Sequence, residues 1–274
     1  MNRLLATDFE RARKNIIFLF GEIVMFMYGI YVPVSLHNDN IKYLHDASYD
    51  KGFCAYVIPV GILMAFFCCI YCGEEYEGRT VQNKIIVGHS RKSIYSAQWL
   101  SCIMVGSIMC LSYFIPSLFI GRILLGSQSR SLSELLMYFI SAMLCVFACV
   151  SLYCMLITTI QKRIAGTALT LFVLLVIIYF GIIVWQDLHL PANTMQFHVV
   201  DGVMTESYGA NPRYPQGGFR IFLEYLFDFL PSGQAWQFNT MTAEKLPRMI
   251  ASSLILLFIT FISGITIFEK RDLK

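Results

Sequence analysis

The stretch LLMYFISAMLCVFACVSLYCMLITTI-QKR-IAGTALTLFVLLVIIYFGIIV, residues 135–184, decides the fold of this chain. It contains two apolar runs, Leu135–Ile160 and Ile164–Val184, and its only charged residues are Lys162 and Arg163 between them. About 20 helical residues cross a hydrocarbon core of roughly 30 Å, and each run is long enough. Because a backbone in lipid finds hydrogen-bond partners only within its own segment, we predict that both runs are transmembrane helices.

The rest of the chain repeats this pattern. Its 274 residues are 57% hydrophobic and 14% charged, whereas soluble domains are about 25% charged. A soluble protein of this size has too small an interior to bury so much apolar surface. We expect an all-α membrane protein with about six transmembrane helices in a single domain, residues 1–274. The other four predicted spans are Ile16–Val34, Phe53–Cys72, Ile94–Ile120 and Met249–Phe268.

The distribution of Lys and Arg predicts the orientation. If the N-terminus is cytoplasmic, the cytoplasmic segments are 1–15, 73–93, 161–163 and 269–274, with thirteen basic residues in 45 positions. The outer segments 35–52, 121–134 and 185–246 have seven in 94 positions. Cytoplasmic loops of membrane proteins are enriched in Lys and Arg. We therefore expect both termini in the cytoplasm of a cell-membrane protein, of bacterial type.

Two features near the membrane are predicted from composition. Leu5, Phe9, Ala12 and Ile16 share one helical face, which favours a short helix on the inner leaflet; a solvated charged tail is the alternative. All nine cysteines fall within predicted spans, so no extracellular disulfide framework is expected. We interpret the cysteines as small packing residues and predict no metal site.

The outer segment 185–246 is the one large segment outside the predicted spans. Residues 208–218 are dense in turn-forming residues and are expected to be irregular. Phe219–Leu230 is mostly apolar but too short to cross a bilayer, and its polar residues are spaced four apart on one helical stripe. We expect a helix that dips into the outer interface or folds back between the spans; an ordinary surface helix is the alternative. The stripe consists of Arg220, Glu224 and Asp228.

The inner segment EEYEGRTVQNKIIVGHSRK, residues 74–92, contains the most specific pattern in the chain. It predicts an acidic turn, a short helix over Thr80–Val87, and a stop at Gly88. Asn83 and Lys84 are expected to face water. The expected apolar face of the helix consists of Val81, Ile85, Ile86 and Val87.

This segment resembles the signature of type-2 ABC exporter permeases. The resemblance lies in Glu75-Tyr-Glu-Gly-Arg-Thr80, the short helix after it, and Ser90-Arg91 before the next span. In that family such a turn leads to a coupling helix that docks on the ATPase subunit. Leu230-Pro-Ser-Gly-Gln234 is similar to the family's outer re-entrant region, and the ending Phe268–Lys274 also looks typical.

The resemblance implies specific roles and partners. Gly78 would supply backbone freedom at the turn, Thr80 would cap the helix by accepting hydrogen bonds, and Glu75 would be an acidic contact or a favourable charge at the helix start. ATP and Mg²⁺ would be bound by a separate cytoplasmic ATPase, and a second copy or a related permease would complete the pathway for a peptide, lipid or other amphipathic substrate. The implied coupling residues are Glu75, Tyr76, Gly78, Thr80, Ile85, Ile86 and Arg91.

The residues themselves exclude some chemistry. The sequence has no Gly-x-x-x-x-Gly-Lys-Ser/Thr phosphate loop, so we expect no cofactor and no ATPase activity in this chain. Its basic residues are spread over several loops rather than interleaved with aromatic residues, so no nucleic-acid partner is expected. The lipid bilayer is the one partner that composition itself predicts.

Two alternatives remain open. Glu74, Glu75 and Arg79 match the acidic pair of intramembrane CAAX-type proteases, but the nearest histidine pattern, Trp185-x-x-x-His189-x-x-x-Asn193, is expected a membrane thickness away. Catalysis needs hydrogen-bond contact between such groups. The chain could also be a membrane scaffold or sensor without an ATPase partner.

Glu22 is the one charged residue in the first predicted span, Ile16–Val34. Charged groups within a span mark functional sites by default, so Glu22 is a candidate pathway residue. The alternative is that it reaches back to the cytoplasmic interface and pairs with Lys14 or a neighbouring chain.

Overall fold

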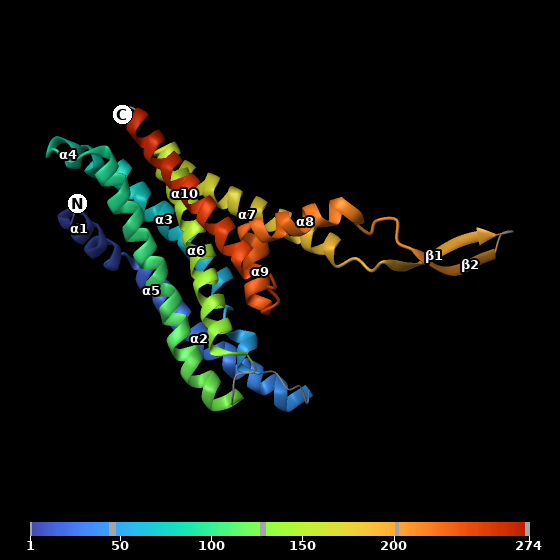
Figure 1. Cartoon of the computed structure of the whole chain (residues 1–274). Helices are drawn as coiled ribbons and strands as arrows, with labels where there is room; N and C mark the ends of the chain where they lie inside the picture. Colours follow the sequence, from blue (N-terminus) through green and yellow to red (C-terminus); the bar gives the residue numbers. More distant parts are fainter. Residues whose placement is uncertain (1, 44–47, 127–129, 201–202, 272–274) are drawn as a thin grey trace.

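The computed structural model describes residues 2–43, 48–126, 130–200 and 203–271, and most of them are helical (Figure 1). Among these residues, six helices are long and apolar enough to cross a membrane. The structure thus confirms the predicted all-α membrane fold with six spans. The spanning helices are α2 (Ile16–Tyr43), α3 (Val57–Glu77), α5 (Arg91–Leu125), α6 (Leu132–Ile160), α7 (Arg163–Leu188) and α10 (Leu246–Lys270).

The first spanning helix is longer than the predicted span. Helix α2 continues through Pro33 to Tyr43, beyond the predicted span end at Val34. The packing of α2 along α5 explains why a proline is tolerated there. At Gly29, an added Cβ would lie 2.4 Å from the carbonyl oxygen of Tyr113 and 2.8 Å from Pro116 Cγ, so the two helices meet almost backbone to backbone.

Helices α3 and α6 form the centre of the bundle. Helix α3 packs between α6 and α7, while α10 lies along α6 and α2 lies along α5. The core is rich in aromatic residues, and several tyrosines from different helices are fully buried. Hydroxyl groups inside lipid need partners, and the core provides some: Tyr113 donates a hydrogen bond of 2.5 Å to the carbonyl of Gly52, in the 3₁₀ turn η1 (Tyr49–Gly52).

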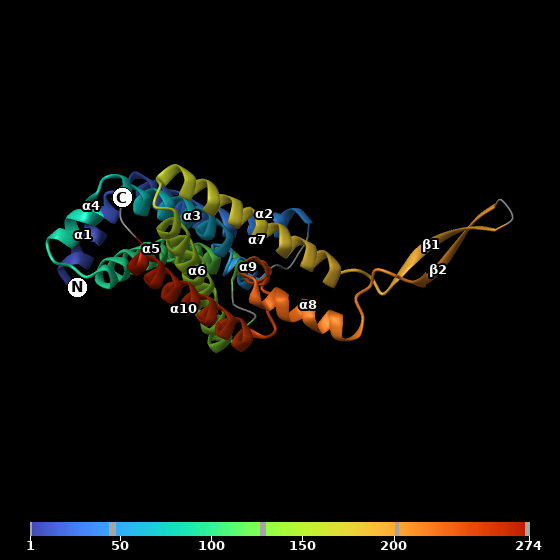
Figure 2. The same ribbon diagram turned by 90° about the horizontal axis from the view of Figure 1, so that it is seen from above.

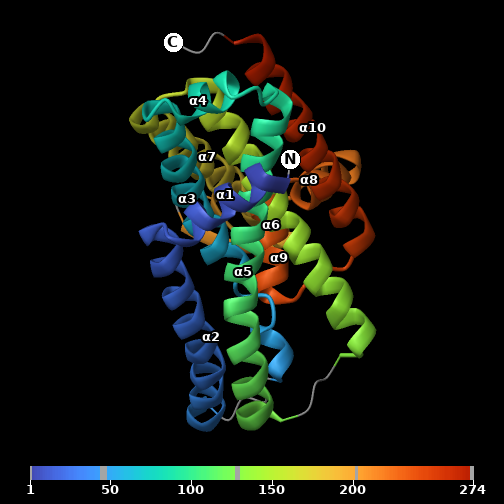
Figure 3. The ribbon, with the colours of Figure 1, turned by 90° about the vertical axis from the view of Figure 1, so that its left-hand side faces the viewer.

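Both ends of the described chain lie at the same end of the bundle, together with helix α4 (Thr80–Ile86) (Figures 1 and 3). We call this the terminal end. Helix α1 (Asn2–Arg13) crosses the spans obliquely there and packs against α5 (Figure 3). The predicted N-terminal helix therefore exists. However, Leu4, Asp8 and Ala12 form its buried face, Leu5 and Phe9 flank that face, and Ile16 belongs to α2 and is exposed.

A β-hairpin that the sequence analysis did not predict projects away from the helices beyond α7 (Figure 2). Strands β1 (Asn193–Val200) and β2 (Val203–Ala210) are antiparallel, with Asn193 opposite Ala210. The expectation of irregular structure from residue 208 is wrong for the last residues of β2. The missed signal is the strand-forming residues in both runs, namely Val, Thr and Phe in the first and Val, Thr and Tyr in the second.

Two short helices follow the hairpin and precede the last span. Helix α8 (Gly217–Phe229) confirms the predicted helix and packs against α7 and α10. Helix α9 (Pro231–Thr240) folds back among the spans, where it contacts α3, α6 and α7. The turn between them is tight: a Cβ added at Gly233 would lie 2.2 Å from the carbonyl oxygen of Phe227.

Candidate functional site

The predicted acidic turn is the last turn of helix α3, which ends at Glu77. Gly78 has φ −76°, an ordinary value, whereas the left-handed residue is Arg79, with φ 55°. The expectation that Gly78 supplies unusual backbone freedom is therefore wrong. Gly78 instead avoids a close contact. A Cβ added at this position would lie 3.0 Å from the carbonyl oxygen of Glu74.

Helix α4 and its stop agree with the prediction. Gly88 has φ +98°, a left-handed value that favours glycine, and it ends the helix. The amide of His89 donates to the carbonyl of Lys84 at 3.1 Å, which closes the last turn. Thr80, however, donates its hydroxyl proton to the carbonyl of Glu75 at 3.0 Å, so the predicted cap in which its oxygen accepts is wrong.

Buried ion pairs join α1, α3 and α4. The carboxylate of Glu75 lies 2.8 Å from Arg11 and 2.6 Å from Lys84, and Lys84 also lies 2.6 Å from Asp8. Glu75 is fully buried and Asp8 is 3% exposed. We call Asp8, Arg11, Glu75 and Lys84 the ion cluster. Glu75 is thus too buried to contact a separate subunit, so the predicted acidic contact is wrong, and its alternative role as a favourable charge near the start of α4 stays a prediction. Lys84 does not face water as expected, because it lies within this cluster.

Tyr71 extends the ion cluster towards the membrane. The Arg11 guanidinium lies 4.1 Å above its ring, and its hydroxyl donates to the carbonyl of Asp8 at 2.7 Å. Burial lowers the pKa of Arg11, whereas the carboxylate of Glu75 raises it, and the net direction is upward. Arg11 is therefore a permanent positive charge. It neutralises Glu75 where solvent is absent and holds α1 against α3.

The predicted apolar face of α4 is divided between two environments. Val81 is buried and Ile85 is half-buried, in a cluster with Ile94, Tyr95 and Phe268. Ile86 and Val87 point away from this cluster and are 82% and 77% exposed. Helix α4 therefore packs on α5 and α10 through Val81 and Ile85. Ile86 and Val87 are exposed at the terminal end.

Arg91 and Tyr76 connect this segment to the spans. Arg91 Nη1 donates to the backbone carbonyls of Phe268, Glu269 and Arg271 at 3.2, 3.0 and 2.5 Å. A cation at these unpaired carbonyls also complements the dipole of α10. The hydroxyl of Tyr76 donates to Thr158 on α6 at 3.1 Å. Displacement of α4 would thus be transmitted to α1, α3, α6 and α10.

Glu22, on α2, lies at the contact between α2 and α5. The Ser112 hydroxyl donates a hydrogen bond to its carboxylate, while Lys14 pairs with Glu10 at 2.8 Å. The suggested pairing of Glu22 with Lys14 is therefore wrong. Glu22 remains a candidate pathway residue, held at the α2–α5 contact.

The polar residues of α8 share one face, as their spacing predicts, and this face lies against the start of α10. Arg220 lies 3.5 Å from Glu224, which lies 3.4 Å from Lys245. Asp228 is nearly buried and lies 2.9 Å from Arg248. These ion pairs fix α8 to the last span.

Two cavities lie near the end opposite the terminal end. An apolar, partly open cavity of about 430 Å³ is lined by α3, α6, α7 and α9. A second cavity of about 490 Å³ shares Trp185 and Trp236 with it and is lined by Glu224, Asp228 and Lys245. The two tryptophan rings are 5.4 Å apart. An apolar space beside a polar one suits an amphipathic molecule.

The protease-like residues do not meet in the described structure. Arg163, at the start of α7, lies 3.6 Å from Glu74, whereas His189 follows the far end of the same helix. Its 26 residues span about 39 Å at helical rise. Hydrogen-bond contact between Glu74 and His189 is excluded in this arrangement.

Sequence reasoning missed the partners of Glu75. Asp8 and Arg11 are remote from Glu75 in sequence, and Lys84 was expected to face water. The available signal was the spacing of Leu4, Asp8 and Ala12, which places a carboxylate on the inward face of α1.

The six apolar spanning helices define an all-α, multi-pass membrane protein. In comparisons with known proteins, no protein-family model matches the chain and no curated protein matches it.

Proposed function

We propose that this chain is the membrane-spanning permease subunit of an ATP-binding cassette transporter, an exporter driven by separate ATPase subunits. One observation carries the proposal: α4 presents the exposed apolar pair Ile86 and Val87 on a helix held by buried ion pairs. Exposed apolar side chains in this setting mark a contact for another protein. The resemblance of residues 75–91 to a coupling segment supports an ATPase as that protein.

The ion cluster would make the proposed docking helix α4 move together with α1 and α3. A helix of seven residues would be unstable alone, but Lys84 fastens α4 to both α1 and α3. Movement of the ATPase against Ile86 and Val87 would therefore tilt these helices together. Arg91 would transmit the same movement to α10.

The cargo is proposed to be amphipathic. The apolar cavity would hold a hydrocarbon or apolar side chains, and the neighbouring cavity with Glu224, Asp228 and Lys245 would hold a polar group. A second permease copy or a related chain would complete the path.

The ATPase contact is tested by charging the exposed tip. A chain with both Ile86→Asp and Val87→Asp should bind its ATP-binding subunit at least about tenfold more weakly, as expected for the loss of central interface residues. Asn83→Asp is the matched control, because it adds a charge to an exposed position of the same helix. The measurement is the amount of ATPase recovered with the tagged permease from native membranes.

Wild-type chain should recover the ATPase at about one copy per permease and should hydrolyse no ATP when purified alone. ATP hydrolysis by the isolated chain, or failure to recover any ATP-binding subunit, would contradict the proposal. The second result would favour a scaffold or sensor.

The proposed orientation places the terminal end in the cytoplasm. A cysteine at Gln216, exposed before α8, should react with an impermeant thiol reagent on intact cells, and one at the exposed Asn83 should not. All native cysteines are buried except the half-buried Cys149, so the unmodified chain is the control. Labelling at position 83 without labelling at 216 would reverse the orientation.

A further inference from the structure

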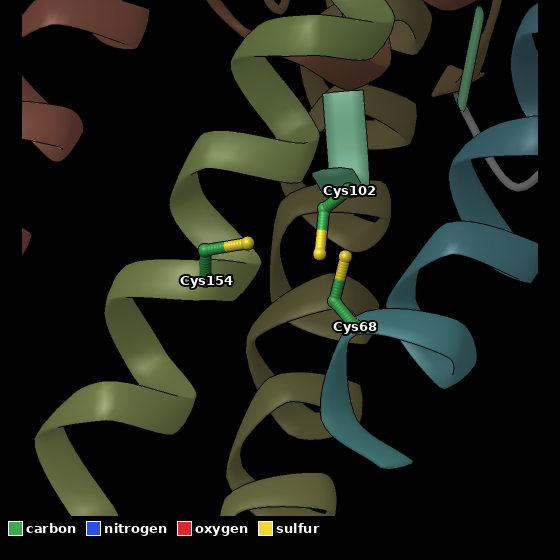
Figure 4. Close-up of side chains that lie close together, drawn as sticks. All are labelled: Cys68, Cys102 and Cys154. Carbon is green, nitrogen blue, oxygen red and sulfur yellow. The ribbon is translucent and has the colours of Figure 1, made fainter. Parts of the chain in front are cut away.

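Four cysteines from three helices converge inside the bundle. Cys68, on α3, Cys102, on α5, and Cys154, on α6, have sulfur atoms that all lie within 4.8 Å of one another (Figure 4). Cys72 lies one turn after Cys68 on α3, and its sulfur is 3.8 Å from that of Cys102. Each of the four is at most 2% exposed. We call these four residues the thiol cluster.

The thiol cluster differs from the other buried cysteines in the direction of its side chains. Figure 4 shows the sulfur atoms of Cys68, Cys102 and Cys154 pointing towards one another from separate helices. Cys69, the next residue on α3, is also buried but does not belong to the group of sulfur atoms that converge. Packing alone requires small apolar side chains and gives no reason for sulfur atoms to meet, since thiols form only weak hydrogen bonds.

We propose that Cys68, Cys102 and Cys154 form a binding site for a soft, thiophilic metal ion, namely Cu(I). Metal–sulfur bonds of about 2.3 Å place sulfur atoms about 4.0 Å apart around a trigonal ion and about 3.8 Å apart around a tetrahedral one. The three sulfur atoms all lie within 4.8 Å of one another, an upper limit about 1 Å above these separations. Thiolate ligands without histidine or carboxylate select Cu(I) and Zn²⁺ among biological ions.

The number of ligands favours Cu(I) over Zn²⁺. Structural Zn²⁺ sites are almost always four-coordinate, whereas three sulfur atoms form this group in the described part of the chain. Cysteine ligands bind metals as thiolates, so binding by all three releases three protons, leaves a net charge of −2 and changes no oxidation state.

The position of the site indicates what the metal would do. Cys72 lies one turn before Tyr76, and Cys154 lies one turn before Thr158, the residue with which Tyr76 forms its hydrogen bond. A bound ion would tie α3, α5 and α6 together one turn inside the terminal end. This inference does not depend on the proposed transport role.

The test is a Cu(I) titration of the purified, reduced full-length chain without oxygen, against a competing Cu(I) chelator. We expect about one Cu(I) per chain, with binding at least about tenfold weaker in Cys68→Ser, Cys102→Ser and Cys154→Ser. Cys69→Ser is the matched control and should bind normally. Cys72→Ser should also bind, because its sulfur is not among the three ligands.

X-ray absorption on the copper-loaded wild type gives a test that needs no variant. Three sulfur neighbours at about 2.3 Å are expected. Zn²⁺ binding that is lost in Cys72→Ser would overturn the three-sulfur Cu(I) site in favour of a four-sulfur zinc site. Failure of the wild type to bind either ion, or equal weakening by Cys69→Ser, would overturn the metal site altogether.

Discussion

Glu75→Ala is expected to destabilise the protein by about 3–5 kcal/mol, the usual cost of removing one partner from a buried ion pair. Without the carboxylate, Arg11 and Lys84 would be left as two positive charges near one another, with Asp8 alone to neutralise them. The contacts of α1 and α4 with α3 would weaken together. The loss should appear as a lower aggregation temperature of the purified chain in detergent.

Glu74→Ala is the matched control, since it removes the neighbouring carboxylate from the same helical turn. Glu74 is 45% exposed and lies 3.6 Å from Arg163, so its loss should cost at most about 1 kcal/mol. Equal effects of the two substitutions would show that the ion cluster does not hold the terminal end together. Removing Lys84 as well as Glu75 should cost less than the sum of the single changes, because the two side chains interact directly.

Gly233→Ala is expected to cost about 3 kcal/mol, at the upper end of the usual range for overpacking. The new methyl group would lie 2.2 Å from the carbonyl oxygen of Phe227, a backbone atom that cannot rotate away. Relief requires α8 and α9 to separate. That movement would disturb Gln234, whose amide donates to the carbonyls of Asp228 and Met249 at 2.7 and 3.3 Å.

Gly218→Ala is the control, because nothing lies within 4 Å of the added methyl group in the first turn of α8. Alanine is the better helix former by up to about 1 kcal/mol, so this variant should be unchanged or slightly stabilised. The measurement is again the aggregation temperature in detergent. A Gly233→Ala protein as stable as Gly218→Ala would contradict the tight α8–α9 turn.

Much of the fold follows from hydropathy. The run Leu135–Ile160 had to be helical because lipid offers its backbone no other partner, and the same reasoning identified all six spans. The span ends were less predictable. Helix α3 continues to Glu77, where Glu74 and Glu77 contact Arg163 at the start of α7, and this contact has no local sequence signal.

The amino-acid sequence by itself determined which segments are helices in a membrane, where α4 stops, and that Arg220, Glu224 and Asp228 share one face. Each of these depends on neighbours a few residues away. The burial of Glu75, the joining of α1 to α4, the left-handed conformation at Arg79 and the convergence of Cys68, Cys102 and Cys154 were decided only in the tertiary structure. The physical reason is that a charge or thiol gains its role from groups that packing brings close, and local periodicity contains no information about that packing.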